Sequence, residues 1–169
     1  VPIRILDIGG GFPVDYDHGN DIDIYTFCAP IRAALAKLPE HVEVIAEPGR
    51  FLIAPAAASI TTVAGKAMRG DQPWYYLDDG VYGMFSGRIY DHARYPLHVF
   101  RTGPTRPSAL VGPTCDSIDV IEEALELPEL EVGDLVVGRM MGAYTAATAS
   151  TFNSLPIPRI VVFGEPAPR

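Results

Sequence analysis

Runs of apolar residues divide the first part of the chain into three expected elements. Ile3–Ile8 and Val42–Ala46 are short apolar runs, typical of buried parallel strands. Residues 22–38 have helical spacing, and one face of this helix would carry Ile24, Phe27, Ile31, Leu35 and Leu38. Pro30 should kink this helix or begin a second helical piece, and Pro39 should end it. The pattern predicts a β–α–β unit with polar groups after both strands, where α/β barrels keep their active sites.

Beyond about Phe51 the pattern changes to short β-type runs that Pro and Gly separate. These runs are Ile60–Val63, Trp74–Leu77, Leu97–Phe100, Ala109–Val111, Leu135–Val137 and Ile160–Phe163. Such punctuation is typical of an antiparallel barrel or sandwich. Ser117–Leu127 is expected to form a short helix, and Ala54–Ala58 and Gly142–Thr151 are expected to form helical turns. We therefore place a domain boundary near residues 52–58, which separates residues 1–55 from a β-domain of residues 56–169.

Composition fits a folded domain and limits its partners. The chain has 169 residues and is 48% hydrophobic, enough for a real core, and it contains no apolar run that could cross a bilayer. A net charge of −8 argues against a nucleic-acid partner and is compatible with a cationic substrate. The two cysteines, Cys28 and Cys115, indicate neither a disulfide framework nor a metal site, so we expect a reducing cytoplasm.

A thiol and a carboxylate stand side by side in the stretch Gly112-Pro113-Thr114-Cys115-Asp116-Ser117. Gly112 and Pro113 end an apolar run and force a turn, which brings Cys115 and Asp116 to a strand end. There the thiol can pass a proton and the carboxylate can hold a cation. The alternative is a small apolar Cys in a turn, with Asp116 capping the next helix.

Two further loops follow the expected strands of residues 1–55. The first is Gly9-Gly10-Gly11-Phe12-Pro13, whose glycines let the backbone approach a ligand and offer N–H groups to a phosphate. This loop lacks the spacing of a dinucleotide fingerprint or a P-loop, and the alternative is a flexible turn. The second is Glu47-Pro48-Gly49-Arg50, for which the alternative is a solvated loop at a strand end.

These loops, together with three later segments, resemble the ornithine decarboxylases, within the alanine-racemase-like class of pyridoxal-phosphate (PLP) enzymes. The later segments are Asp79-Gly80-Val81-Tyr82-Gly83 with Tyr90-Asp91-His92, the Cys115–Asp116 stretch, and Met141–Thr145 with Ser150–Asn153. The family fold is a (β/α)₈ barrel followed by a β-domain. The resemblance implies that residues 1–55 are the last units of the PLP-binding barrel and that residues 56–169 form most of the C-terminal antiparallel β-barrel or sandwich domain.

The resemblance also implies roles for the residues that match the family. Gly9, Gly10, Gly11, Gly49, Arg50 and Tyr144 would anchor the PLP phosphate. Glu47 would face the ring nitrogen and keep it protonated. Asp91 and Asp116 would hold the distal amine of a basic amino acid, and Cys115 would guide protonation of the α-carbon. Tyr82 and Phe152 match aromatic residues of a dimer interface, across which Cys115 and Asp116 would reach the cofactor of the other subunit.

One departure from the family is decisive. The only lysines are Lys37 and Lys66, and neither matches the Schiff-base lysine, which the family carries on an early barrel strand. A half barrel would also expose strand edges and an apolar inner face. We therefore expect the chain to need a complementary N-terminal part, to be inactive alone, and to form a homodimer of such pairs.

The function that the resemblance implies is decarboxylation of ornithine or lysine to a diamine, a step of polyamine biosynthesis. One rival is a non-catalytic binding protein similar to antizyme inhibitors, which would need none of Glu47, Arg50, Cys115, Asp116 and Tyr144. Another is a decarboxylase for arginine or diaminopimelate. The acidic pair would repel the distal carboxylate of diaminopimelate, whereas the choice between lysine and ornithine depends on the depth of the pocket.

Overall fold

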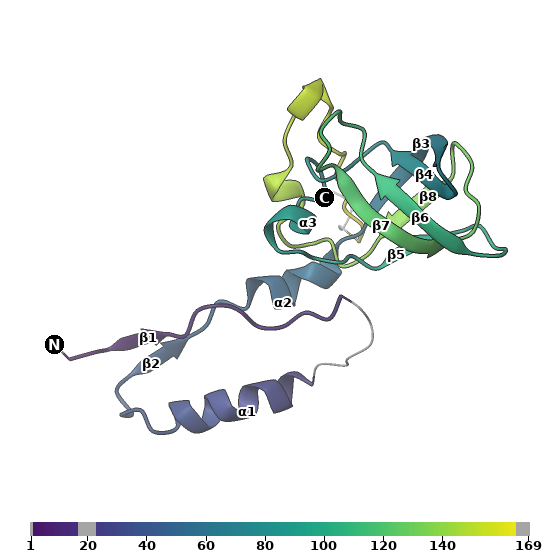
Figure 1. Ribbon diagram of the computed structural model, residues 1–169. Coiled ribbons are helices and arrows are strands. Elements are labelled where there is room, and N and C mark those ends of the chain that lie inside the picture. The colour runs from purple at the N-terminus through teal and green to yellow at the C-terminus, as the bar shows by residue number, and fades with distance from the viewer. Residues whose placement is uncertain (1, 17–22, 165–169) are drawn as a thin grey trace.

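The computed structural model describes residues 2–16 and 23–164, which form an elongated N-terminal part and a compact sheet domain (Figure 1). The N-terminal part contains β1 (Ile5–Asp7), α1 (Ile24–Leu35) and β2 (Glu43–Ile45). The short helix α2 (Gly49–Ile53) and the 3₁₀ turn η1 (Ala54–Ala56) lead from it into the sheet domain. No helix among the described residues is long and apolar enough to cross a membrane.

The N-terminal part is the predicted β–α–β unit. β1 and β2 pair in parallel, with Leu6 opposite Val44, and α1 connects them. The carboxylate of Asp23 begins α1 by accepting hydrogen bonds from the backbone N–H groups of Tyr25 and Thr26. α1 is one helix that runs through Pro30, so the predicted second helical piece does not form. Ile22, where we expected the helix to begin, lies outside the described residues.

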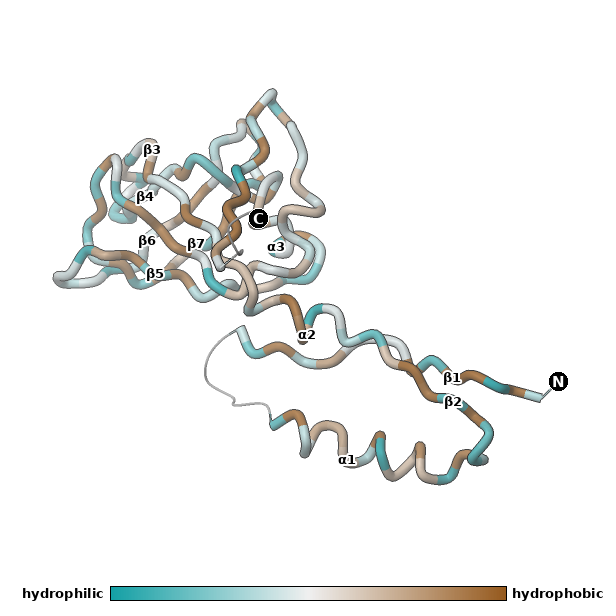
Figure 2. The backbone as a smooth tube through the Cα atoms, turned by 180° about the vertical axis from the view of Figure 1, so that it is seen from behind, coloured by the Kyte–Doolittle hydropathy of each residue, from teal (hydrophilic) through white to brown (hydrophobic). Residues whose placement is uncertain are grey.

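This unit leaves much of its apolar surface uncovered. α1 has no buried residue, and the exposed fractions are 77% for Tyr25, 58% for Ile5 and 44% for Ile45. Figure 2 shows apolar stretches along β1 and β2 as well as in the sheet domain. One β–α–β unit cannot close a barrel, so the described residues contain no (β/α)₈ barrel.

The sheet domain is a six-stranded mixed sheet that curls into a nearly closed barrel (Figure 1). Its strands are β3 (Ser59–Arg69), β4 (Gln72–Leu77), β5 (Leu97–Val99), β6 (Arg106–Val111), β7 (Val120–Leu127) and β8 (Leu135–Gly138), in the order β5-β8-β3-β4-β6-β7. Every pair is antiparallel except β4 and β6, which run parallel with Trp74 opposite Ala109. The prediction of an antiparallel domain is therefore only partly right.

The core of the sheet domain follows the period of two expected for strands. In β4 the buried positions alternate, and Tyr75 and Leu77 are fully buried. The largest fully buried apolar side chains are Tyr75, Phe85, Leu77, Leu110, Ile121, Leu130, Met141, Val63 and Val136. Each contributes about 1.5–3 kcal/mol by leaving water, so the sheet domain holds most of the hydrophobic stabilisation of the chain.

Two sequence predictions in this domain are wrong. Residues 120–127 form strand β7 rather than a helix, because they pair along β6 with Leu110 opposite Glu122 and Ser108 opposite Leu125. Ile160–Phe163 is not a strand, and Phe163 is 90% exposed. A strand needs a partner for its backbone N–H and C=O groups, and this segment pairs with none of the described strands.

Three short helical segments complete the sheet domain, and all carry predicted site residues or lie beside them. They are α3 (Gly87–Tyr90), η2 (Ala146–Thr148) and η3 (Phe152–Ser154). The segment before η2 docks on η1, because the N–H groups of Met141 and Gly142 donate to the carbonyl oxygens of Ala57 and Ala54. Gly142 permits this contact, since a Cβ there would overlap the carbonyl oxygen of Ile53.

Candidate functional site

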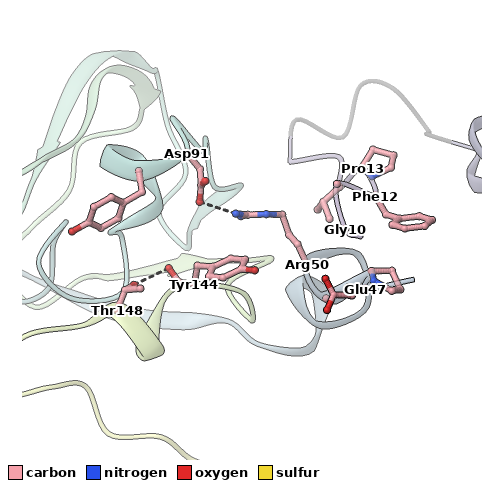
Figure 3. A pocket seen from close by; sticks show the side chains of 13 residues that line it. Gly10, Phe12, Pro13, Glu47, Arg50, Asp91, Tyr144 and Thr148 are labelled. Carbon is pink, nitrogen blue, oxygen red and sulfur yellow. Dashed lines mark hydrogen bonds and ion pairs between the residues drawn. The ribbon is translucent and has the colours of Figure 1, made fainter. Parts of the chain in front are cut away.

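A cavity of about 690 Å³ lies where the N-terminal part meets the sheet domain (Figure 3). Its lining comes from both parts and comprises Gly10, Gly11, Phe12, Pro13, Val14, Glu47, Pro48, Gly49, Arg50, Tyr90, Asp91, Tyr144 and Thr148. A cavity of this size suits a cofactor or a small metabolite. The segments that end β1 and β2 therefore meet the segments around α3 and η2.

The glycine loop after β1 packs against the end of β2. Gly9 and Gly11 have φ of 70° and 81°, which favours glycine at both positions. The carbonyl oxygen of Gly9 accepts from Glu47 N–H at 2.8 Å, and a Cβ on Gly10 would lie 2.9 Å from the carbonyl oxygen of Glu47. The Gly9 N–H donates to Asp7 at 2.8 Å, and Gly9 does not line the cavity. Gly10 and Gly11 do line it, beside Glu47 and Gly49.

Arg50 extends across the cavity and connects its two walls (Figure 3). One guanidinium nitrogen forms an ion pair with Asp91 at 2.7 Å, and another donates to the Tyr16 hydroxyl at 3.1 Å. The guanidinium also lies 4.7 Å from the centre of the Tyr144 ring. Partial burial alone would lower the pKa of Arg50, but the hydrogen bonds to Tyr16 and Asp91 outweigh it and raise the pKa. The cavity therefore contains a protonated guanidinium that is paired with the Asp91 carboxylate.

A second cluster of predicted residues lies on the loops of the sheet domain. The Tyr82 hydroxyl donates to Asp116 Oδ2 at 2.5 Å, and the Tyr82 ring stacks on Phe152 with 4.2 Å between centroids. Asn153 Nδ2 donates to the exposed Cys115 Sγ at 3.4 Å. The hydrogen bond to Asp116 raises the pKa of Tyr82 to about 12, and the same bond lowers the pKa of Asp116. Asp116 is thus held as a carboxylate beside an accessible thiol.

One buried carboxylate ties the two loops of this cluster together. Asp119 is 3% exposed and accepts from Val81 N–H at 2.8 Å and from the N–H and hydroxyl of Thr114 at 3.0 and 2.7 Å. Gly80 and Gly112 leave room for it, because a Cβ on either would overlap its oxygen. The loop that carries Tyr82 is therefore fixed to the loop that carries Cys115 and Asp116.

The structure divides the predicted residues into two groups. Glu47, Arg50, Asp91 and Tyr144 share the cavity with Gly10, Gly11 and Gly49. Cys115 and Asp116 belong to the second cluster with Tyr82 and Phe152, and none of these four lines the cavity. Asp91 is paired with Arg50, and Asp116 with Tyr82, so a single chain does not bring the two carboxylates to one point.

Several residues of the site were missed by sequence reasoning. Tyr16 stands next to a polar loop without any motif, yet it holds Arg50. Thr148 lies in a Thr- and Ala-rich stretch that predicts only a turn. Asp119 follows Cys115 by four residues, and a buried carboxylate cannot be told from an exposed one by sequence alone. Neither Lys37 nor Lys66 lines the cavity, and Lys66 pairs with Glu131 at 2.7 Å.

Comparison with known proteins points to one family. Residues 16–142 match the family model described as "Pyridoxal-dependent decarboxylase, C-terminal sheet domain". The chain is 43% identical over 158 residues to the lysine/ornithine decarboxylase of Selenomonas ruminantium, which covers 94% of this chain and 40% of that protein. It superposes on the Vibrio vulnificus lysine/ornithine decarboxylase complexed with cadaverine with a TM-score of 0.90 and 55% identity, over 96% of this chain and 44% of that one.

The similarity extends to relatives with other names. Antizyme inhibitor 2 of Xenopus laevis is 40% identical over 168 residues, which is 88% of this chain and 36% of that protein. The arginine decarboxylase of Paramecium bursaria Chlorella virus, bound to agmatine, has a TM-score of 0.79 and 36% identity, over 90% of this chain and 42% of that one. The chain thus spans about two fifths of the length of the proteins it matches.

Proposed function

The chain belongs to the pyridoxal-dependent decarboxylase family, as its sequence predicted, and from that premise we propose that it is the C-terminal part of an ornithine/lysine-type decarboxylase. The proposed reaction removes the α-carboxylate of ornithine or lysine and releases a diamine for polyamine biosynthesis. The observation that carries this proposal is that one cavity is lined by Glu47, Arg50, Asp91 and Tyr144 together with Gly10 and Gly11 of the glycine loop.

The residues of this cavity fit PLP. Arg50, paired with Asp91 in the structure, would supply positive charge for the phosphate. Gly10 packs on the carbonyl oxygen of Glu47, and the glycine loop would offer backbone N–H groups to the phosphate. Gly11, Gly49 and the Tyr144 hydroxyl complete the proposed phosphate site, whereas the N–H of Gly9 is taken by Asp7. Glu47 follows the end of β2 and lies beside this loop, where its carboxylate would keep the ring nitrogen of PLP protonated. When bound, PLP supplies an electron-withdrawing ring that stabilises the charge left at the α-carbon after carbon dioxide leaves.

The chain lacks a lysine for attaching PLP, which supports the proposal of a complementary N-terminal part. Its two lysines lie outside the cavity. The uncovered apolar residues of α1, β1 and β2 offer a surface on which further barrel units would pack, with residues 1–55 as the last units of that barrel. Residues 157–163 add a second uncovered apolar segment, in which Ile160 and Val162 are 70% and 62% exposed.

The separation of the two residue groups supports a homodimer with shared sites. Asp116 and Cys115 do not line the cavity of their own chain, and the Cys115 thiol is exposed. In a dimer they would enter the cavity of the partner subunit. There Asp116 would hold the distal ammonium together with Asp91, and Cys115 would deliver a proton to the α-carbon. Tyr82 and Phe152 would line this interface as a stacked pair.

The charges of the site favour a substrate with a cationic end. Asp91 and Asp116 would repel the distal carboxylate of diaminopimelate and attract the ammonium of ornithine or lysine. The chain is 43% and 55% identical to the two lysine/ornithine decarboxylases and 36% identical to the arginine decarboxylase, which favours lysine and ornithine over arginine. Both cysteines are free, which fits the cytoplasm as the proposed compartment.

The variant Glu47→Gln distinguishes the proposed decarboxylase from a non-catalytic regulator similar to antizyme inhibitors. It is tested in the chain assembled with its complementary N-terminal part. We expect decarboxylation of ornithine and lysine to fall at least 100-fold in kcat, because the amide cannot hold the ring proton, while PLP affinity changes much less. PLP titration and carbon dioxide release measure the two effects separately. An assembled protein that binds no PLP would instead favour the non-catalytic regulator, and an unchanged kcat would remove Glu47 from the reaction.

A further inference from the structure

Ser86 is a buried hydroxyl behind the cavity wall. It directly precedes α3 and is 1% exposed. Its Oγ donates to the carbonyl oxygen of Tyr144 at 3.0 Å and lies 2.6 Å from the Thr148 hydroxyl. Thr148 Oγ1 is also 3.0 Å from the same carbonyl oxygen, a contact drawn as a dashed line in Figure 3. Two hydroxyl groups therefore converge on the backbone of one cavity residue.

That backbone has a conformation which tyrosine rarely adopts. Tyr144 has a φ of 54°, in the left-handed region where a bulky side chain is disfavoured. Such a conformation persists only where the surroundings hold it. The preceding Gly142 is fixed on η1 by its hydrogen bond to Ala54, and the carbonyl of Tyr144 is fixed by Ser86 and Thr148.

The conformation decides where the Tyr144 side chain points. In the left-handed state the ring lies 4.7 Å from the Arg50 guanidinium and lines the cavity. An extended or right-handed backbone at this position would send the Cα–Cβ bond in another direction. By holding the backbone of Tyr144, the hydrogen bonds to its carbonyl oxygen therefore also keep its ring in the cavity wall.

We propose that Ser86, assisted by Thr148, is a positioning residue that holds Tyr144 in the left-handed conformation and so places its hydroxyl at the phosphate end of the cavity. This inference rests on the proposed function, because the contact of Tyr144 with the PLP phosphate belongs to that proposal. Ser86 touches neither cofactor nor substrate. It acts through the main chain of Tyr144 alone.

A double-mutant cycle on PLP affinity tests the inference in the chain assembled with its complementary part. Ser86→Ala should raise the Kd for PLP about tenfold, the size expected for one lost buried hydrogen bond. Tyr144→Phe removes the phenol hydroxyl and should also raise Kd. The double variant should bind little worse than Tyr144→Phe alone, because Ser86 is proposed to affect PLP binding mainly through the Tyr144 hydroxyl.

A matched control and a second variant separate the proposed effect of Ser86 from a general loss of stability. Ser108→Ala removes another fully buried serine hydroxyl, whose bond to the Arg106 carbonyl stays within β6, and it should leave Kd unchanged. Should Ser86→Ala fail to fold, Thr148→Val removes the neighbouring hydroxyl at constant shape and should weaken PLP binding in the same direction.

The outcomes separate this inference from the proposed function. If Tyr144→Phe leaves PLP affinity unchanged, the proposed phosphate contact is wrong. If Tyr144→Phe weakens binding but Ser86→Ala does not, or if the two effects simply add, Ser86 is a structural residue and the inference is overturned.

Discussion

At the scale of single residues, hydrogen bonding sets the charges that the proposed chemistry needs. Arg50 stays cationic between Tyr16 and Asp91, and Asp116 stays anionic under the Tyr82 hydroxyl. A carboxylate with a lowered pKa is charged throughout the neutral range, so it can hold an ammonium group without a change of protonation. The same bond leaves Tyr82 protonated, because its pKa rises to about 12.

The Tyr82–Asp116 bond gives a pH-dependent prediction. The folded state lowers the pKa of Asp116 from the ordinary 3.8, so the bond contributes stability above pH 3.8 and loses it as pH falls through the folded pKa. On the alkaline side the contribution of Tyr82 is complete below pH 10 and is lost as pH rises through about 12. Tyr82→Phe should therefore destabilise the protein at pH 7, and the destabilisation should shrink as pH falls through the folded-state pKa of Asp116.

Urea unfolding of the assembled enzyme as a function of pH measures this difference, and carboxyl NMR follows the pKa of Asp116. In Tyr82→Phe that pKa should rise toward 3.8. Tyr76→Phe on β4 is the matched control, because it removes a tyrosine hydroxyl that is bonded to Arg69 rather than to Asp116, and it should leave the pKa of Asp116 unchanged. An Asp116 carboxyl that titrates identically in Tyr82→Phe and the parent protein would show that the bond does not set its charge.

At the scale of elements, the site depends on how two turns dock. The 142–148 segment reaches η1 only because Gly142 has no Cβ, and this contact places Tyr144 beside Arg50. The contact joins backbone to backbone, so neither side can relax by a side-chain rotation.

Gly142→Ala should lower the free energy of unfolding by about 1–3 kcal/mol, because the new methyl group overlaps the carbonyl oxygen of Ile53. It should also weaken PLP binding by displacing Tyr144. Gly65→Ala in β3 is the matched control, since its Cβ would meet only Tyr76 atoms at 3.8 Å or more. Denaturant unfolding measures the free energy of unfolding of both variants. Equal values would show that the 142–148 segment shifts to accept the new methyl group at little cost.

Sequence patterns predicted the elements with a regular hydrophobic period. They missed features that depend on pairing with strands distant in the sequence. The apolar runs of β1, β2 and β4 and the helical spacing of α1 identify these elements within a few residues. Residues 120–127 contain Glu, Ala and Leu, which favour helix, but pairing with β6 overrides that preference. The parallel contact of β4 with β6 could not be predicted either, because register and direction leave no local signal.

The site shows the same division. The loops after β1 and β2 were expected at one active-site face, and Gly10, Gly11, Glu47 and Arg50 line one cavity. Asp91 is expected to hold a substrate ammonium, and in the structure it forms an ion pair with Arg50, a partner that the sequence did not indicate. Tyr16 and Ser86 form side-chain hydrogen bonds with segments distant in the sequence, and such contacts have no sequence pattern.

At the scale of the whole molecule, the chain combines a well-packed sheet domain with a β–α–β unit that has almost no core. Arg50 joins the two parts through Asp91, yet α1, β1 and β2 keep large apolar residues in water. A surface of this kind is typical of an interface that another segment covers. The proposed complementary part would cover it and supply the missing lysine.

The most direct test of this account is carbon dioxide release from L-ornithine and L-lysine by the chain mixed with an N-terminal part from a lysine/ornithine decarboxylase, in the presence of PLP. We predict a stable complex of both parts that releases carbon dioxide and forms putrescine or cadaverine, and no release by either part alone. A chain that stays a folded, lone 18.3 kDa monomer in analytical ultracentrifugation of that mixture, and that releases no carbon dioxide in it, would contradict the account.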